Sequence, residues 1–199
     1  MRGMRRAGMA AVGKHFPGHG AVKEDSHYAI PFDRRRYEDI QMDDMVSFER
    51  LIHAGLAAVM PAHVIFPEVD DKPAGFSSVW LRNILRQQLE FQGVIFSDDI
   101  SMAGAEAMGG YVDRAHCALD AGCDMVLLCN NQPAAIDVLD NLKVTPNPAS
   151  QSRLIRMHGK NEYDFASMKH DEKWQVASEE ISGLVVEPEL ALGDDEIQA

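Results

Sequence analysis

The sequence predicts an α/β protein in which short strands alternate with helices around a parallel sheet. Two observations indicate this fold class. Short apolar runs rich in strand-forming residues end abruptly in polar residues, a pattern typical of strands covered on both faces. Helical patterns lie between these runs, and strands that alternate with helices form βα units.

Four segments are expected to be the strands. They are GMAAVGKHF (8–16), AAVMPAHVIF (57–66), GVIFSDDI (93–100) and CDMVLLCN (123–130). In βα folds, the reactive groups gather beyond the carboxyl ends of the strands. One rim of the sheet is therefore expected to collect the polar residues that follow each strand, namely Lys14, His15, His63, Asp98, Asp99, Asn130 and Asn131.

A helix is expected after each strand. The expected ranges are 37–54, 78–89 with a serine N-cap, 111–121, and a fourth that begins near Pro133. Gly55 and Gly122 follow the first and third of these helices and can end them in the left-handed conformation. Ile136 and Leu139 are expected on the apolar face of the fourth.

The number of βα units indicates half of a TIM barrel. A (β/α)8 barrel needs eight units and about 250 residues, whereas this chain of 199 residues offers four units and then a different tail. MRGMRRAG (1–8) also resembles the last turn of a helix. Residues 1–145 are therefore expected to form the C-terminal half of a barrel, with two open strand edges. Residues 146–199 are expected to form a helical extension with a frayed acidic end.

Composition indicates an ordinary soluble protein. The net charge of −12 argues against a nucleic-acid partner, because nucleic-acid binders present a basic face. No run approaches the length of a membrane span, and the opening residues are interpreted as mature structure rather than a signal peptide. Three cysteines without a CxxC pair fit a reducing compartment. We therefore expect a cytoplasmic location and no membrane partner.

Asp98 is the first candidate for chemistry. A carboxylate at the end of a buried strand can be held rigidly toward a pocket, which suits a nucleophile or a metal ligand. An N-cap or a loop-ordering hydrogen bond is the alternative role. Asp99 fits that alternative better, because side chains of adjacent residues in an extended segment point apart.

The loop after the first strand supplies candidate proton carriers. In DSH (25–27), Asp25 can contact His27 and raise its basicity, although both could also be solvated loop residues. Glycines around His19 allow residues 16–30 to move as a lid that carries His27. His53, His116, His158 and His170 are assigned no role.

Two further interpretations remain open at this point. A metal-dependent hydrolase would use a ligand cluster on the rim, drawn from His15, His19, His27, His63 and Asp98, although no tight ligand motif such as HExxH occurs. An inactive fragment or sugar-binding remnant would lack half of its pocket. Activity that survives a chelator would exclude the first interpretation, and hydrolysis by the isolated chain would exclude the second.

The motifs KHFPGHG, DSH, MPAHV, GVIFSDDISM and DAGCDMVLLCNN resemble those of the glycoside hydrolase family 3 β-N-acetylglucosaminidases of bacterial peptidoglycan recycling. The resemblance runs from about Gly8 to about Leu142. It implies a TIM-barrel hydrolase that removes terminal GlcNAc from GlcNAc-anhydroMurNAc muropeptides with retention of configuration and without a cofactor. It also implies roles in carbohydrate metabolism, cell wall biogenesis, cell division and cell shape.

By motif position, the resemblance also implies residue roles. Asp98 matches the nucleophile, and His27 with Asp25 behind it matches the acid/base dyad. Lys14 and His15 match residues that hold sugar hydroxyls, and His63 lies in a matching rim motif. Members of the family have roughly as much barrel again before this point, so the missing half barrel, or self-association, is expected as a partner.

Overall fold

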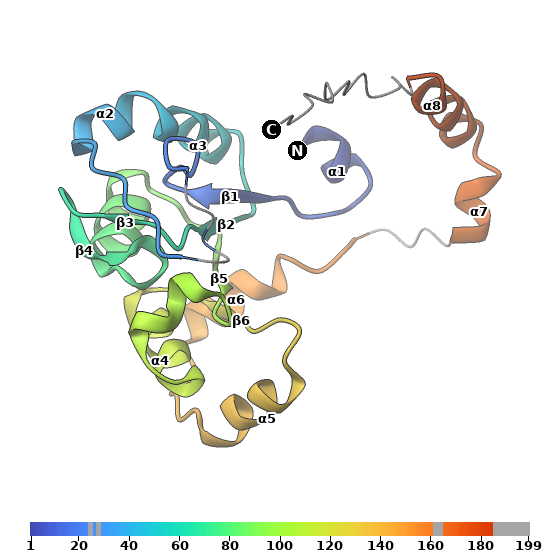
Figure 1. Ribbon diagram of the computed structural model, residues 1–199. Helices are drawn as coiled ribbons and strands as arrows, with labels where there is room; N and C mark the ends of the chain where they lie inside the picture. Colours follow the sequence, from blue (N-terminus) through green and yellow to red (C-terminus); the bar gives the residue numbers. More distant parts are fainter. Residues whose placement is uncertain (24–25, 27–28, 161–164, 185–199) are drawn as a thin grey trace, which may run out of the picture. The chain divides into compact units, whose positions relative to one another are not determined.

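The computed structural model describes residues 1–23, 26, 29–160 and 165–184 (Figure 1). Asp25 and His27 lie outside the described residues. The chain divides into two compact units, Met1–Lys160 and Asn161–Ala199. The domain boundary expected after residue 145 remains a prediction. The helix that follows that position, α6 Pro148–Ile155, is part of the first unit.

The first unit is built on a four-stranded parallel sheet with the order β1-β2-β5-β6 (Figure 1). Its strands are β1 Val12–Phe16, β2 Ala58–Pro61, β5 Val94–Asp99 and β6 Met125–Leu127. A separate antiparallel hairpin consists of β3 Ile65–Phe66 and β4 Asp70–Pro73. The predicted α/β class with a parallel sheet is thereby confirmed.

Helices follow each strand of the sheet. Those of the first unit are α1 Arg2–Arg6, α2 Tyr37–Met42, α3 Asp44–His53, η1 Ala74–Phe76, the π-helix η2 Val79–Gln88, η3 Ala103–Met108, α4 Tyr111–Ala121, α5 Gln132–Asn141 and α6 Pro148–Ile155. The second unit contains α7 Phe165–Lys169 and α8 Glu172–Ser182. In the second unit, the Asp171 carboxylate caps α8 by accepting from the Lys173 amide.

The core lies between the sheet and the helices on one side of it. Phe16, Phe66 and Trp80 are fully buried there, and the Trp80 ring meets the other two edge-on, with centroids 5.9 Å and 5.0 Å away. Such contacts add to the stability gained from burying large apolar area. This packing fixes β1 and β3 against η2.

Three expected elements differ from the structure. The helix expected over 37–54 breaks at Asp43, whose φ of −113° and ψ of −81° are not helical. The strand expected over 57–66 is split, because Ile65 turns away to pair with Pro73 in the hairpin. Leu139 of α5 is 81% exposed although it was expected on the apolar face, whereas Ala134 and Val138 are buried.

Both edges of the sheet are open within the described residues. Strands β1 and β6 lie at the ends of the strand order, and Val12 and Met125 on them are each 40% exposed. An unpaired edge presents free backbone donors and acceptors to another strand. The first unit can therefore accept a further strand at either edge.

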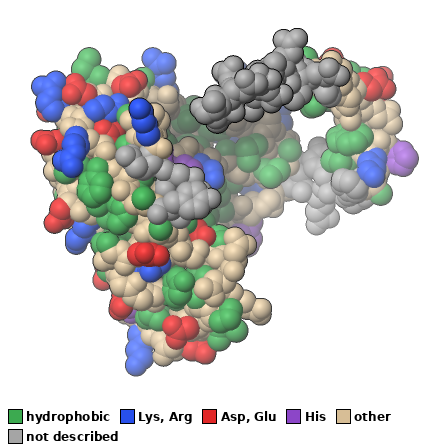
Figure 2. Space-filling view, viewed as in Figure 1, with side chains coloured by type: hydrophobic (Ala, Val, Ile, Leu, Met, Phe, Trp, Pro, Cys, Tyr) green, Lys and Arg blue, Asp and Glu red, His purple; other side chains and the backbone are tan. Residues whose placement is uncertain are grey.

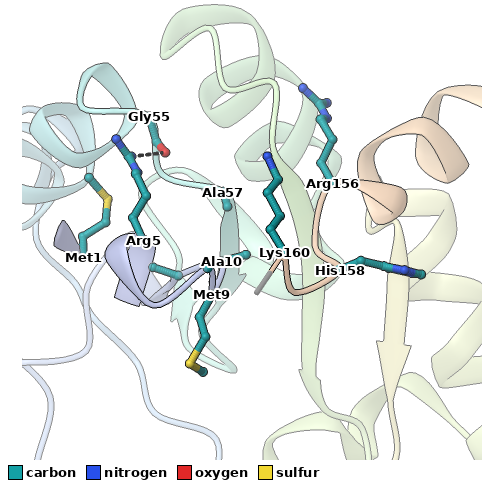
Figure 3. A pocket seen from close by; sticks show the side chains of 11 residues that line it. Met1, Arg5, Met9, Ala10, Gly55, Ala57, Arg156, His158 and Lys160 are labelled. Atoms are coloured by element: carbon teal, nitrogen blue, oxygen red, sulfur yellow. Dashed lines mark hydrogen bonds between the residues drawn. The ribbon is translucent and has the colours of Figure 1, made fainter. Parts of the chain in front are cut away.

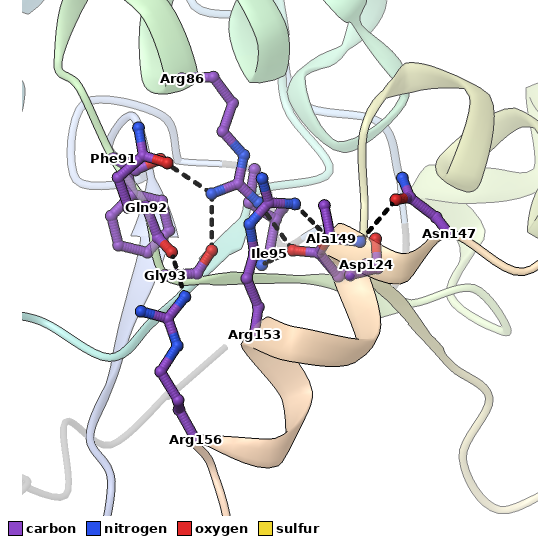
Figure 4. Close-up of polar contacts among 11 residues, drawn as sticks. Arg86, Phe91, Gln92, Gly93, Ile95, Asp124, Asn147, Ala149, Arg153 and Arg156 are labelled. Atoms are coloured by element: carbon purple, nitrogen blue, oxygen red, sulfur yellow. Dashed lines mark hydrogen bonds and ion pairs between the residues drawn. The ribbon is translucent and has the colours of Figure 1, made fainter.

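A polar network joins α6 to the amino-terminal ends of the strands (Figure 4). The buried Asp124 carboxylate accepts from Arg86 at 2.7 Å, from Arg153 at 2.9 Å, from Ser150 at 2.6 Å and from the Ile95 amide at 2.9 Å. Charged hydrogen bonds of this kind are stronger than neutral ones. Residues of the expected extension are thus anchored to the sheet.

The surface of the first unit mixes charge types. On the face shown in Figure 2, acidic and basic side chains are interspersed with apolar ones. Within the described part of the chain, no helix has the length and apolar character needed to cross a membrane.

Candidate active site

Asp98 lies at the carboxyl end of β5, as the sequence predicts. Most of β5 is buried, and Asp98 retains 8% of its surface exposed. Its Oδ1 accepts a hydrogen bond from the Asp99 amide at 2.9 Å, which leaves Oδ2 free of that contact. A carboxylate held in this way keeps one oxygen available for a ligand.

His15 faces Asp98 from β1, two strands away in the sheet. The distance from His15 Nε2 to Asp98 Oδ2 is 3.7 Å, and the side chains are 30% and 12% exposed. Burial lowers the pKa of His15, and the Asp98 carboxylate opposes that shift. His15 is thus held mainly neutral at pH 7, beside an oxygen that it can contact directly.

Asp99 orders the loop at the end of the strand. Its Oδ1 accepts from the amides of Ser101 at 2.9 Å and Cys129 at 3.0 Å, which ties the end of β5 to the end of β6. This is the loop-ordering role that the sequence indicates for Asp99. Asp98 and Asp99 therefore separate into one carboxylate toward the rim and one committed to backbone.

His63 lies beneath the rim and is fully buried. Its Nε2 is 3.0 Å from the Asp99 carbonyl oxygen, and its ring stacks on Phe76 with a centroid separation of 5.2 Å and an angle of 3°. Burial lowers the pKa of His63. Its direct contact with sugar remains a prediction from the motif, since the structure places the ring against protein.

Of the lid expected over residues 16–30, the structure describes residues 16–23, 26 and 29–30. His19 Nε2 lies 3.4 Å from Ser26 Oγ, and the His15 and His19 rings are 6.2 Å apart. The Ser26 carbonyl accepts from the Gly104 amide at 3.1 Å, so the segment reaches η3. Lys14 is exposed on β1. The predicted dyad residues flank Ser26 in the sequence, outside the described residues.

The described residues contain no group of three or more His, Cys, Asp or Glu side chains placed to hold a metal ion. His27, one member of the alternative metal cluster, lies outside the region that this statement covers. Of the other members, His15 and Asp98 lie together, while His63 has its Nε2 on a backbone carbonyl. His15 and Asp98 are thus the two candidate ligands of this set that the described rim brings into an ion-pair distance.

A pocket of about 200 Å³ lies by the residues that precede β1, away from the rim (Figure 3). Several of its lining side chains are cationic, but Arg5 donates to the carbonyls of Ala54 and Gly55 at 2.8 Å and 3.0 Å. Arg156 likewise donates to the Gln92 carbonyl at 2.9 Å. These cations are committed to backbone oxygens, so we assign the pocket no substrate.

Sequence reasoning missed Arg114. Its side chain is buried and donates to the carbonyls of Gly109 and Ile100, both at 2.8 Å, and lies over the Tyr111 ring. Ile100 directly follows β5, so Arg114 fixes the loop next to Asp98 and Asp99. The available signal was its place three residues after Tyr111, on the buried side of the predicted helix.

The histidines predict how stability depends on pH. A buried histidine whose folded pKa lies below its unfolded value of about 6.5 binds fewer protons in the folded state, so stability falls as pH falls below that value. Urea unfolding between pH 7.5 and 5 should show this loss, with up to about 1.4 kcal/mol per pH unit from His63. His63→Gln should reduce the slope of stability against pH, because the variant lacks this titrating imidazole. The carboxylates of the protein titrate as before and account for the slope that remains. Equal slopes in both proteins would contradict the prediction.

Comparison with known proteins gives the family. The model of the glycosyl hydrolase family 3 N-terminal domain matches residues 1–157. A β-hexosaminidase of Thioalkalivibrio sulfidiphilus is 55% identical over 192 residues, which cover 96% of this chain and 55% of that protein. A β-hexosaminidase of Methylobacillus flagellatus is 58% identical over 159 residues, covering 80% and 46%. The chain thus spans about half the length of these relatives.

Solved structures of the same family resemble this chain in sequence and in fold. NagZ from Neisseria gonorrhoeae in complex with N-trifluoroacetyl-D-glucosamine is 38% identical with a TM-score of 0.83, covering 93% of this chain and 53% of that one. A family 3 β-N-acetylglucosaminidase from Paenibacillus is 30% identical with a TM-score of 0.78, covering 91% and 38%. Together with the match over residues 1–157, these likenesses show that the chain belongs to glycosyl hydrolase family 3.

Proposed function

We propose that this chain carries the nucleophile of a retaining β-N-acetylglucosaminidase. The observation that carries the proposal is the Asp98 carboxylate at the end of β5, with Oδ1 held by backbone and Oδ2 3.7 Å from His15. A rigid, partly shielded carboxylate at the rim of a βα fold is suited to attack on an anomeric carbon. The names of the relatives support the same activity.

In the first step, an Asp98 oxygen forms a bond to the anomeric carbon while the glycosidic carbon–oxygen bond breaks. The leaving oxygen takes a proton from the acid/base residue, for which we propose His27 with Asp25 behind it. In the second step, that residue takes a proton from water, whose oxygen displaces Asp98 and releases the sugar. Two displacements retain the configuration.

The neighbours of Asp98 support these steps. A neutral His15 can hydrogen-bond a sugar hydroxyl, and its proximity to Asp98 would bring that hydroxyl close to the reacting carbon. We propose the same hydroxyl-binding role for Lys14, whereas His63 of the rim motif is fully buried and would act on the site from beneath it. An imidazole as acid/base avoids a second anion beside Asp98 and can exchange a proton near pH 7.

We propose GlcNAc-anhydroMurNAc and its peptide derivatives as substrates, in the cytoplasm and as part of peptidoglycan recycling. The support is the combination of motifs, together with relatives named β-hexosaminidase and one solved with an N-acylated glucosamine. This assignment would connect the chain to cell wall biogenesis, division and cell shape. No cofactor takes part in the proposed chemistry.

We further propose that the four βα units are the second half of a barrel. The open edges at β1 and β6 support this arrangement, and so does the length of the relatives, which is nearly twice that of the matched part. Either a further four units or a second copy of the chain would supply the missing strands. A chain left without them would be an inactive fragment or a sugar-binding remnant.

Release of 4-nitrophenol from 4-nitrophenyl N-acetyl-β-glucosaminide tests the function. The purified chain should be assayed alone, and after co-expression with the part of the Thioalkalivibrio relative that it does not cover. Hydrolysis in either sample that survives a chelator supports a glycosidase without a metal. Activity only after co-expression assigns the missing sugar contacts to the added half. Absence of hydrolysis in both samples would overturn the proposal.

A further inference from the structure

We propose that His63 is a positioning residue for Asp98. The His63 Nε2–H donates to the carbonyl of Asp99, and this contact holds the neighbouring Asp98 carboxylate in place. This inference rests on the proposed role of Asp98 as nucleophile. It assigns His63 a function beneath the rim, where the ring has no exposed surface. The partner is the backbone of the residue that follows the reacting carboxylate, at a distance of 3.0 Å.

The end of β5 needs such support because the parallel ladder stops there. Asp99 is held at three points: its carbonyl by His63 and by the Met102 amide at 3.2 Å, its side chain by the Ser101 and Cys129 amides, and its own amide by Asp98 Oδ1. The last of these contacts joins the backbone directly to the Asp98 carboxylate. A shift of the Asp99 peptide would therefore turn the carboxylate that faces His15.

The His63 ring is itself rigidly placed. It stacks on Phe76 at an angle of 3°, and a Cβ built on Gly104 would lie 2.8 Å from the His63 Cβ. The ring is thus packed against η1, and its Cβ against η3. A donor fixed by close packing loses little entropy when it makes its hydrogen bond.

The contact also fixes the protonation of the ring. A carbonyl only accepts, so Nε2 carries the proton and Nδ1 is bare; Nδ1 is buried without a hydrogen-bond partner among the described residues. Burial lowers the pKa of His63, which favours this neutral form. His63 can therefore hold Asp99 without placing a cation beside the proposed nucleophile.

Substitutions separate the donor from the packing. The terminal amide of glutamine can reach the place of Nε2, whereas that of asparagine reaches only the place of Nδ1. Phenylalanine keeps the stack on Phe76 but has no donor. His63→Gln should therefore preserve the side-chain donor to the Asp99 carbonyl, while His63→Phe and His63→Asn leave that oxygen with the Met102 amide alone. His53→Gln is a matched control, because His53 contacts the Glu49 carbonyl from an exposed position on α3.

Amide hydrogen exchange measured by NMR tests the proposal without relying on activity. In His63→Phe, the amides of Asp99, Ser101 and Cys129 should exchange at least about tenfold faster, while the Val94 amide of the β2–β5 ladder stays protected. His63→Gln and His53→Gln should keep all four amides near the wild-type rates. His63→Asn should show the same faster exchange as His63→Phe. If His63→Phe does not fold, the exchange rates of His63→Asn test the proposal in its place.

Kinetics on the same variants provide the second readout. Where hydrolysis is measured, His63→Phe should lower kcat at least about tenfold with little change in KM, and His63→Gln should restore most of it. Equal acceleration of all amides, or identical behaviour of the glutamine and phenylalanine variants, would overturn the proposal in favour of a purely structural role. If no sample hydrolyses the substrate, the proposed function fails, while the exchange data still decide whether His63 holds Asp99.

Discussion

Hydrolysis of 4-nitrophenyl N-acetyl-β-glucosaminide should fall at least about 1,000-fold when Asp98 is replaced by asparagine, a loss of about 4 kcal/mol in transition-state stabilisation. Asparagine keeps the shape of the side chain and can still accept from the Asp99 amide, but its amide is a far weaker nucleophile than a carboxylate. The fold should therefore survive while the first displacement fails. Initial rates at saturating substrate, measured in whichever sample is active, provide the test.

Asp71→Asn is the matched control for this variant, because Asp71 is exposed on the β3–β4 hairpin. It removes the same charge and should leave the rate unchanged. A small anion should also rescue a cavity variant: added azide should restore turnover of the aryl glycoside by Asp98→Gly. A rate for Asp98→Asn within tenfold of wild type would show that another group is the nucleophile.

The second large effect is expected on stability, at Asp124. Its carboxylate is 1% exposed and pairs with Arg86 at 2.7 Å and Arg153 at 2.9 Å (Figure 4). Asp124→Asn should lower the free energy of unfolding by about 3–5 kcal/mol, because it leaves the mostly buried Arg86 without its counter-ion. Burial already lowers the pKa of Arg86 to about 10, with Asp124 opposing that shift. Urea denaturation followed by circular dichroism measures the change.

Asp140→Asn provides the comparison, since Asp140 is exposed on α5. It should change the free energy of unfolding by less than about 0.5 kcal/mol. Removal of Arg153 should cost less than removal of Asp124, because Arg86 and Asp124 would remain paired. Equal stability of Asp124→Asn and Asp140→Asn would show that the network contributes specificity rather than free energy.

Local patterns predicted the elements whose boundaries depend on local chemistry. The helix expected over 111–121 is α4 with the same bounds, because Gly122 ends it at a φ of +130° that other residues rarely adopt. Gly55 ends α3 in the same way at +80°. The serine expected to cap η2 is Ser77, whose hydroxyl accepts from the Trp80 amide at 3.1 Å, while Ser78 makes no capping hydrogen bond. Which of two neighbouring serines caps a helix depends on the direction from which the chain enters.

Elements whose form depends on distant partners were predicted less well. The segment expected as one strand over 57–66 divides because Pro31, Pro73 and Ala74 offer backbone partners to its second part. Leu139 has an apolar side chain at helical spacing, yet it is exposed because no described element covers that face. Periodicity indicates a face that can be buried and does not identify what buries it.

The sequence by itself determined that a carboxylate ends a buried parallel strand, because the apolar run and the aspartates that stop it are adjacent in the chain. The roles of Asp25 and His27 remain predictions from their motif. Only the tertiary structure decided that His15 meets Asp98 across the sheet, that His63 holds Asp99, and that Asp124 joins α6 to the strands. These contacts join residues from separate elements, and their directions depend on how the strands twist and how the helices pack, which spacing along the chain does not specify.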